Sequence, residues 1–148
     1  EAVKRGVMLF IDYGYPRSEY YHPQRGMGTL VCNYRHRAHD DPLILPGLQD
    51  ITAFVDFSAA AQAGVSAGLD VLGFASQAQF LLGAGLLDLV QEETMAPAGS
   101  PAGLLLAQQV KTLTLPGEMG ERFKVLALGR DCDVPLRGFS LSDQRFRL

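Results

Sequence analysis

Short, continuous runs of apolar residues alternate along the chain with segments rich in glycine, proline and polar side chains. The first run, Val7–Ile11, is too short for a helix and lacks the polar alternation of a half-exposed strand, which is typical of a strand covered on both faces. We therefore expect Val7–Ile11 to be a central parallel strand of an α/β sheet. Further strands are predicted at Gly28–Tyr34, Leu69–Phe74 and Phe123–Leu128.

Helices are predicted between these runs. Asp56 is the expected N-cap of the first helix and Gly68 its C′ residue, because Asp accepts hydrogen bonds from free amides and Gly adopts a left-handed conformation. Ser76 and Gln79 have the spacing of a capping box, so a second helix begins there. The predicted helices are Phe57–Gly68, a segment from Ser76 to about Gln91 that Gly83–Gly85 interrupts, and Leu104–Leu113.

The remaining segments are predicted loops. Residues 17–27 are rich in Tyr, Pro, Gln and Arg, and residues 97–103, inside a linker-like insertion at about 94–103, are almost wholly Pro, Gly, Ala and Ser. We expect the tail from Asp131 to be irregular, with solvated arginines at positions 130, 137, 145 and 147. The alternation of strands and helices predicts one α/β domain over residues 1–148.

Composition fits one globular domain. Of the 148 residues, 47% are hydrophobic and 20% are charged, which excludes a disordered chain. The 13 basic residues against 16 acidic ones give a net charge of −3, so no positive excess predicts a nucleic-acid partner. The longest uncharged windows contain polar or helix-breaking residues and predict no membrane span. Cys32 and Cys132 are too few for a disulfide scaffold, so we expect reduced thiols and a cytoplasmic protein.

The start of the chain predicts the C-terminal part of a longer protein. Position 1 is Glu, and a short basic segment ending at Gly6 leads directly into the first apolar run without a signal-peptide core. Such a start is typical of the middle of an α/β unit. We therefore expect the chain to contain only part of an active site.

The best site candidate is the segment Asp12-Tyr13-Gly14-Tyr15, at the end of the first predicted strand. Ligands of open α/β sheets bind outside the carboxyl ends of strands, and a carboxylate beside a phenol can orient a cation or accept a proton. In the alternative interpretation, Asp12 only caps backbone amides and the tyrosines cover apolar surface. Asp50 and Thr52 have the same two interpretations, since they either line this site or bond the local turn.

Other chemical signals are weaker. His36 and His39 precede Asp40 and Asp41, and His22 is a third imidazole, but their spacing favours a hydrogen-bonded loop, so we predict no metal site. Close glycine pairs lack the third glycine of a dinucleotide fingerprint, and no glycine precedes a Lys-Ser or Lys-Thr pair. No serine lies in a nucleophile-elbow sequence, which disfavours a serine hydrolase.

Four longer motifs occur in one order along the chain: Ile11–Tyr15, His36–Asp40, Asp50–Ser58 and Met119–Phe123. Together they resemble the MidA-like family of S-adenosylmethionine-dependent methyltransferases. The resemblance extends from about residue 6 to residue 130, and four ordered motifs are much more specific than any one. Phe54 departs from the family pattern, in which a polar residue is more usual at that position.

The resemblance implies a Rossmann-like α/β fold, the class I methyltransferase fold, with a mostly parallel seven-stranded sheet and a final antiparallel strand. The four predicted strands would be the fourth to seventh of that sheet. The first three strands would precede residue 1, together with the glycine-rich loop and the acidic residue that hold S-adenosylmethionine in the family. The isolated chain is therefore expected to be inactive.

The resemblance also implies roles for site residues. The Asp12-Tyr13-Gly14 motif would face the methyl donor and acceptor, with Asp12 and Tyr13 in catalysis and Asp12 and Gly14 against the cofactor. A mitochondrial member methylates an arginine of a respiratory-complex subunit, which implies a protein guanidinium as the acceptor, oriented by Asp12 in a pocket that Tyr13 shapes. The acceptor would bind Tyr15, His36, His39, Asp50 and Thr52.

Two other functions remain open. The first is a noncatalytic interaction module, because the strand Val7–Ile11 would lack a neighbour in such a fragment and would expose unpaired backbone groups. The second is a metal-dependent hydrolase that uses His36 and His39. The expected partners are a protein substrate and the remainder of the methyltransferase domain, without nucleic acid or membrane, and a homodimer is also compatible with the sequence.

Overall fold

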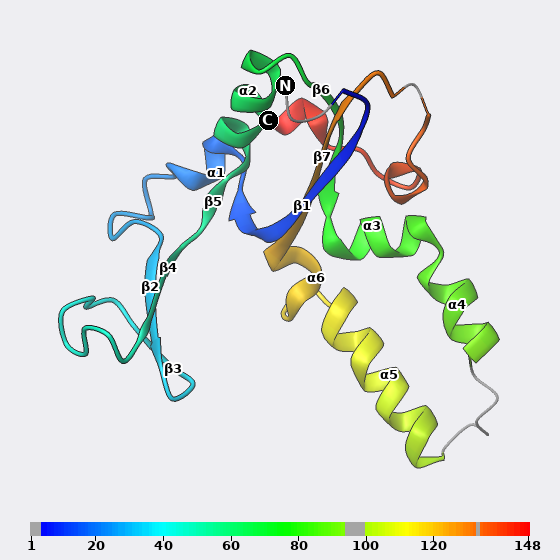
Figure 1. Cartoon of the computed structure of the whole chain (residues 1–148). Helices are drawn as coiled ribbons and strands as arrows, with labels where there is room; N and C mark the ends of the chain where they lie inside the picture. The colour runs from blue at the N-terminus through cyan, green and yellow to red at the C-terminus, as the bar shows by residue number, and fades with distance from the viewer. Residues whose placement is uncertain (1–3, 94–99, 133) are drawn as a thin grey trace.

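The computed structural model describes residues 4–93, 100–132 and 134–148, and its centre is a four-stranded sheet (Figure 1). The strands lie in the order β5 (Val55–Asp56), β1 (Gly6–Tyr15), β7 (Phe123–Arg130) and β6 (Asp70–Ser76). Strand β7 is antiparallel to both β1 and β6, so those two strands point in the same direction. The predicted α/β class and the final antiparallel strand are confirmed.

Helix α2 (Phe57–Ser66) covers one face of this sheet. The helix begins where predicted, because the Oδ1 atom of Asp56 accepts a hydrogen bond of 2.9 Å from the Ala59 amide. Phe57 of α2 and Phe74 of β6 are fully buried between the helix and the sheet, with ring centroids 5.4 Å apart. Burial of one such side chain contributes roughly 1.5–3 kcal/mol, so this pair is a main source of packing energy between α2 and the sheet.

The C-terminal tail covers the opposite face through the short 3-10 helix η1 (Arg137–Phe139). The ring of Phe139 packs at 5.1 Å from that of Phe80 and against the buried Val125. The main sheet is therefore covered on both sides at β6 and β7.

Two helices follow β6, α3 (Gln77–Ala84) and α4 (Leu86–Glu93). Gly85 separates them with a φ of 103°, which is the left-handed conformation that favours glycine, so the predicted interruption is confirmed. Ser76 is the N-cap residue as predicted, but its hydroxyl forms no capping hydrogen bond, and its Oγ atom is buried without a partner among the described residues. The prediction of a capping-box hydrogen bond from Ser76 is therefore wrong.

Helix α5 (Pro101–Thr114) extends away from the main sheet and contacts α3 (Figure 1). It begins inside the predicted linker, where Ser100 caps it by accepting a 3.2 Å hydrogen bond from the Gly103 amide, while residues 94–99 lie outside the described part. The short helix α6 (Met119–Arg122) then leads into β7. Within the described residues, no helix has both the length and the apolar character that crossing a bilayer requires.

A second, three-stranded antiparallel sheet lies apart from the first (Figure 1). Its strands are β3 (Arg37–His39), β2 (Leu30–Tyr34) and β4 (Asp50–Ala53), and the short helix α1 (Arg17–Tyr20) precedes them within the predicted loop. The strand predicted at Gly28–Tyr34 is β2, but its prediction as a member of the main sheet is wrong. A turn with positive φ at Arg35 (46°) and His36 (63°) folds β3 back onto β2, so the pairing is local.

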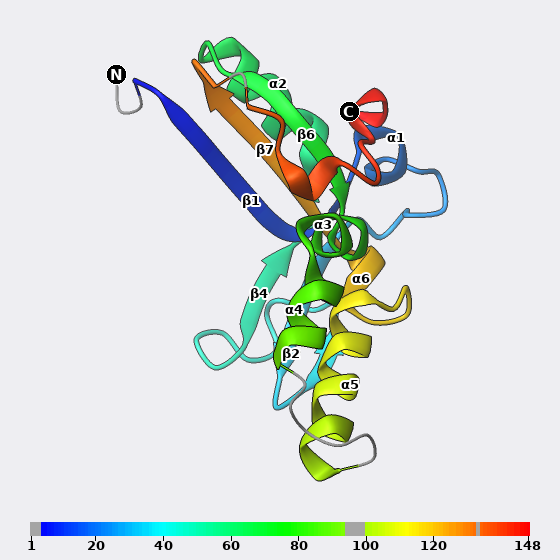
Figure 2. The ribbon, with the colours of Figure 1, turned by 90° about the vertical axis from the view of Figure 1, so that its right-hand side faces the viewer.

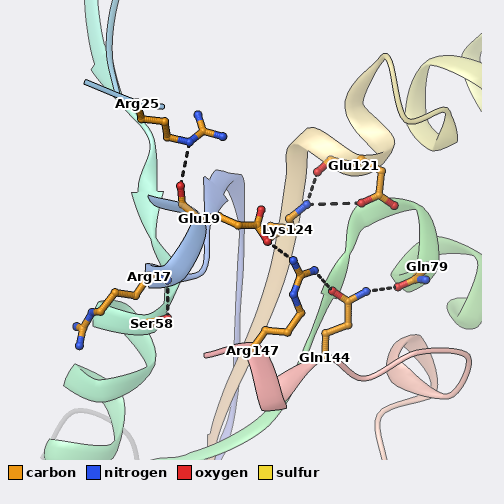
Figure 3. Close-up of polar contacts among 9 residues, drawn as sticks. All are labelled: Arg17, Glu19, Arg25, Ser58, Gln79, Glu121, Lys124, Gln144 and Arg147. Atoms are coloured by element: carbon orange, nitrogen blue, oxygen red, sulfur yellow. Dashed lines mark hydrogen bonds and ion pairs between the residues drawn. The ribbon is translucent and has the colours of Figure 1, made fainter. Parts of the chain in front are cut away.

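Of the four arginines predicted to be solvated, Arg137, Arg145 and Arg147 are exposed as expected and Arg130 is half-buried, but all four also make polar contacts within the chain. Arg147, in the 3-10 helix η2 (Arg145–Arg147), pairs with Glu19 of α1 and donates a 2.8 Å hydrogen bond to Gln144 (Figure 3). Gln144 in turn donates a 2.9 Å hydrogen bond to Gln79 of α3. The other arginines of this group also have polar partners: Arg130, Arg137 and Arg145.

The edge of β1 opposite β7 is open over most of its length (Figure 2). Among the described residues, a neighbouring strand pairs with this edge only at Gly14 and Tyr15, where β5 runs parallel to it. Leu9, Phe10 and Ile11 are exposed by 49%, 45% and 51%. An open edge flanked by apolar side chains is a surface that other protein segments can cover.

Candidate functional site

A cavity of about 690 Å³ is lined jointly by the carboxyl end of β1 and by the second sheet. Four aromatic rings line it, and we call them the aromatic wall: Tyr13, Tyr15, Phe54 and Phe123. Tyr13 and Tyr15 are two residues apart on one strand and therefore project from the same face of β1. Phe54 follows β4, and Phe123 begins β7, so three separate segments build the wall.

Tyr13 lies at the centre of this wall. Its ring makes edge-to-face contacts with Phe54 at 5.2 Å and with Phe123 at 5.7 Å, which are favourable geometries for aromatic pairs. Its hydroxyl group is hydrogen-bonded to the Oγ1 atom of Thr52. The ring is therefore fixed both by packing and by a polar bond to the second sheet.

A cationic side chain stacks on the ring of Tyr15. The guanidinium carbon of Arg25 lies 3.8 Å from the centroid of the Tyr15 ring, within the range of a cation–π contact. The Nε atom of Arg25 donates a 2.9 Å hydrogen bond to the backbone carbonyl of Glu19 (Figure 3). Phe54 packs beside the Tyr15 ring at 5.4 Å. The aromatic wall thus already holds one guanidinium group.

The rest of the cavity lining comes from small and polar side chains. Val31, Asn33 and Ala38 line it from the second sheet, and Arg122 lies at the other side, just before β7. Asn33 is paired with Ala38 across that sheet, as Val31 is with Thr52, so these residues share one face of it. Among the described lining residues, the charged ones are arginines only.

Asp12 does not line this cavity. Its side chain lies on the opposite face of β1 from Tyr13, and its Oδ1 atom accepts a 2.8 Å hydrogen bond from the Tyr13 amide. There it lines a smaller cavity of about 270 Å³ along the open edge of β1, with apolar neighbours that include Phe10 and Val55. The sequence placed Asp12 and Tyr13 in one pocket, whereas the strand alternation separates them.

Gly14 serves the packing of β1 against β5. A Cβ atom at this position would lie 2.3 Å from the Val55 carbonyl oxygen and 2.8 Å from the Phe57 ring, so only glycine allows this close approach. The contact gives Gly14 a structural reason that is independent of its predicted role against a cofactor.

His36 and His39 lie away from the cavity. His36 is exposed in the turn between β2 and β3, and His39 is paired with Cys32 across the second sheet. The Nδ1 atom of His39 is buried without a hydrogen-bond partner in the described structure. Within the described ranges, no cluster of three or more His, Cys, Asp and Glu side chains is arranged to hold a metal ion.

The cavity brings together part of the predicted site. Tyr13, Tyr15 and Thr52 line it together, whereas Asp50 is exposed, pairs with Asn33 and is not part of the lining. Sequence reasoning missed Arg25 altogether. The other lining residues that were not predicted as site residues are Phe54, Phe123, Arg122, Val31, Asn33 and Ala38.

Two buried titratable groups lie outside the cavity. Burial lowers the pKa of Lys124, an effect that the Glu121 carboxylate, 3.7 Å from its Nζ atom, opposes. Burial raises the pKa of the Cys32 thiol, and the carboxylates of Asp41 and Asp40 act in the same direction. A thiol with a raised pKa is a poor nucleophile at neutral pH, which disfavours thiolate chemistry at Cys32.

The comparisons with known proteins point in one direction. A model of a family of S-adenosyl-L-methionine-dependent methyltransferases matches residues 1–75. The mitochondrial protein arginine methyltransferase NDUFAF7 of Mus musculus is 37% identical over 127 residues, covering 83% of this chain and 26% of that protein. The NDUFAF7 homolog of Drosophila melanogaster is 32% identical over 134 residues, covering 86% of this chain and 28% of that protein.

Solved structures agree with these relatives. A Burkholderia thailandensis protein, crystallised with bound S-adenosyl-homocysteine, superposes on the chain with a TM-score of 0.91 and 52% identity. The superposition covers 97% of this chain and 36% of that one, and the chain spans about a quarter of the length of the curated relatives, 26% for the mouse protein. The cofactor of the family is S-adenosylmethionine. Because the family model matches 75 of the 148 residues and the structural match extends over nearly the whole chain, the chain belongs to the MidA-like family of S-adenosylmethionine-dependent methyltransferases.

Proposed function

We propose that this chain supplies the acceptor side of a methyltransferase site and that the acceptor is an arginine side chain of a protein. The observation that carries the proposal is the stack of Arg25 on Tyr15 at 3.8 Å, because it places a guanidinium against the aromatic wall of the cavity. A flat cation that stacks on one tyrosine can be replaced by another of the same shape. The NDUFAF7 relatives are named as protein arginine methyltransferases, which supports the same acceptor.

The residues present fit one side of the cofactor. The smaller cavity at the open edge of β1 combines an apolar surface with a single carboxylate, Asp12, whose Oδ2 atom is not used by the bond to the Tyr13 amide. Such a carboxylate can accept hydrogen bonds from a hydroxyl or an ammonium group. When bound, S-adenosylmethionine supplies an electrophilic methyl group on a sulfonium. In this proposal Asp12 holds the cofactor and no longer orients the acceptor.

The aromatic wall would align the acceptor. Methyl transfer is an in-line displacement, so its rate depends on the position of the attacking nitrogen and on the exclusion of water. Tyr15 and Phe54 would hold the guanidinium plane, and Tyr13, fixed by Thr52, would close the cavity behind it. As the bond from the acceptor nitrogen to the methyl carbon forms, the carbon–sulfur bond of the sulfonium would break and the thioether would be the leaving group. The guanidinium would release one N–H proton to water, since no carboxylate is among the described residues that line the cavity.

The open edge of β1 supports the further proposal that another part of the methyltransferase domain covers it. Leu9, Phe10 and Ile11 are about half exposed there, beside the cavity of Asp12. The solved relative is much longer than the region it shares with this chain. The glycine-rich loop that binds the cofactor in the family would belong to that other part, and the isolated chain would be inactive.

The test incubates the full-length protein with isotope-labelled S-adenosylmethionine and an extract of cells that lack this protein. We expect label in the methylarginine of one or few proteins, found by hydrolysis and mass spectrometry. Tyr15→Leu should lower this transfer at least about tenfold, because the stacking surface is lost. Tyr34→Leu, in β2 but outside the cavity lining, is the matched control. Label found only in lysine or in small molecules would contradict an arginine acceptor.

A noncatalytic interaction module is the second candidate, and the same open edge of β1 favours it. In that case the full-length protein would transfer no label to any acceptor, although a partner would still bind along β1. Arg substitutions of Leu9 and Ile11 would then abolish partner binding. Labelled methylarginine in the experiment above would exclude this candidate.

A further inference from the structure

We propose that Arg25 is a built-in occupant of the acceptor position, so that an acceptor guanidinium binds on Tyr15 only after Arg25 has left it. The inference rests on the proposed function of the cavity as an acceptor site. Its geometric basis is that Arg25 lines the 690 Å³ cavity and lies 3.8 Å above the Tyr15 ring. At that separation no second planar group fits between the two side chains.

The charge of the cavity favours replacement of Arg25 by an acceptor guanidinium over binding of the acceptor beside it. Arg25 and Arg122 are the charged side chains among the described lining residues, and none of the lining residues is acidic. A third guanidinium in the same space would be repelled by both. Replacement of Arg25 by an acceptor arginine leaves the charge of the cavity unchanged. A cationic acceptor is therefore best accommodated when Arg25 moves out.

The attachment of Arg25 is weak enough for such a movement. Apart from the stack, its side chain has one hydrogen bond, from Nε to the Glu19 carbonyl at 2.9 Å, and no ion pair with a described carboxylate. The Glu19 carboxylate is paired with Arg147 instead. Figure 3 shows Arg25 next to Glu19 and away from the cluster around Arg147 and Gln144.

The structure also offers a place for the displaced side chain. A hollow of about 420 Å³ adjoins Arg25 on the side of α1 and is lined by Glu19, His22, Gln24 and Arg25. The acidic Glu19 belongs to this hollow and not to the cavity. A rotation of the Arg25 side chain would thus exchange an aromatic contact for the vicinity of a carboxylate.

When Arg25 occupies the Tyr15 ring, an added guanidinium cannot bind there. The apparent affinity for that guanidinium is therefore reduced by the fraction of molecules in which Arg25 has left the ring. The probe for the experiment is Nα-acetylarginine amide, titrated into the full-length protein and followed by ligand-observed NMR. We expect Arg25→Ala to lower the apparent Kd about tenfold. The double variant Arg25→Ala, Tyr15→Leu should lose this gain, because the probe then lacks its stacking surface.

Arg35 provides a matched control. Its guanidinium carbon lies 5.3 Å from the Tyr34 ring, and neither residue lines the cavity. Arg35→Ala should leave the apparent Kd unchanged. If Arg25→Ala unfolds the protein, Arg25→Gln replaces it, since Gln keeps a donor for the Glu19 carbonyl and removes the cation. An unchanged or higher Kd in the folded Arg25 variant overturns the inference.

Methyl transfer by the same variants separates this inference from the proposed function. Tighter probe binding without any methylarginine would leave the inference standing and overturn the arginine acceptor. Methylarginine formation together with unchanged probe binding would overturn the inference alone.

Discussion

Tyr13 and Thr52 connect the two sheets of the molecule through a hydrogen bond between their hydroxyl groups, across 39 residues of sequence. Tyr13 belongs to β1 of the main sheet and Thr52 to β4 of the second sheet, and both line the aromatic cavity. The ring of Tyr13 is already held by Phe54 and Phe123. The bond therefore sets where the second sheet lies relative to the cavity wall.

Tyr13→Phe removes this bond and keeps the ring. We expect the free energy of unfolding, measured by urea denaturation, to fall by about 1 kcal/mol, the usual net value of one hydrogen bond. Methyl transfer by the full-length protein should fall further, by about tenfold, because the cavity loses its fixed wall. Thr52→Val is the partner variant. If the double variant is no less stable than either single one, the two hydroxyl groups act together, whereas additive losses would contradict the direct bond.

Gly14→Ala tests the close approach of β1 and β5. The new Cβ atom would lie 2.3 Å from the Val55 carbonyl oxygen and 2.8 Å from the Phe57 ring, so the strands must separate. We expect a loss of about 3 kcal/mol in the free energy of unfolding, the upper end of typical overpacking costs. Gly26→Ala is the control, because a Cβ atom there has no neighbour within 4 Å. Equal effects of the two substitutions on the melting temperature would contradict the steric argument.

The sequence predicts where the strands lie along the chain better than it predicts which strands pair with one another. The apolar runs identify β1, β2, β6 and β7, because a continuously apolar run of this length favours a strand whichever neighbour it has. The prediction that β1 is covered on both faces is wrong, since Leu9, Phe10 and Ile11 are about half exposed at its open edge. The membership of β2 in a second sheet follows instead from the turn at Arg35 and His36, where two residues without glycine adopt positive φ. Arg and His rarely adopt positive φ, so the sequence does not predict this turn. Without the turn, the strand is expected in the main sheet.

The site residues likewise divide into those that strand periodicity can place and those that it cannot. A period of two along β1 already separates Asp12 from Tyr13 and places Tyr15 with Tyr13, so this part of the site was within reach of sequence reasoning. The contact of Arg25 with Tyr15 depends on how the loop after α1 folds back. A loop arginine has no periodicity that would indicate its partner, which is why Arg25 was missed.

The buried amine of Lys124 predicts a pH dependence of stability. Burial lowers its pKa in the folded protein below the ordinary value of 10.5, so between these two values the unfolded chain binds more protons than the folded one. The free energy of unfolding contributed by this group therefore rises as the pH rises through that window. Urea denaturation at pH 7.5, 9 and 10 should show this rise in the wild type relative to Lys124→Met. Parallel pH profiles of the two proteins would contradict a lowered pKa.

Asp12 is the sharpest test of how the site is divided between donor and acceptor. Its carboxylate lines the cavity at the open edge of β1, on the other face of the strand from Tyr13 and the aromatic wall. Asp12→Asn keeps the size of the side chain and an acceptor for the Tyr13 amide, so we expect a stability change below about 1.5 kcal/mol.

Single-turnover methyl transfer by the full-length Asp12→Asn protein should fall about a hundredfold, the scale at which positioned groups act. Because Asp12 lies away from the aromatic wall, we expect a higher apparent Kd for S-adenosylmethionine and an unchanged KM for the acceptor. Asp70→Asn, an exposed carboxylate at the start of β6 and the opposite end of the sheet, is the control for charge removal. A raised KM for the acceptor with unchanged cofactor binding would return Asp12 to the orienting role that the sequence predicted. Equal rates for wild type and variant would remove it from the mechanism.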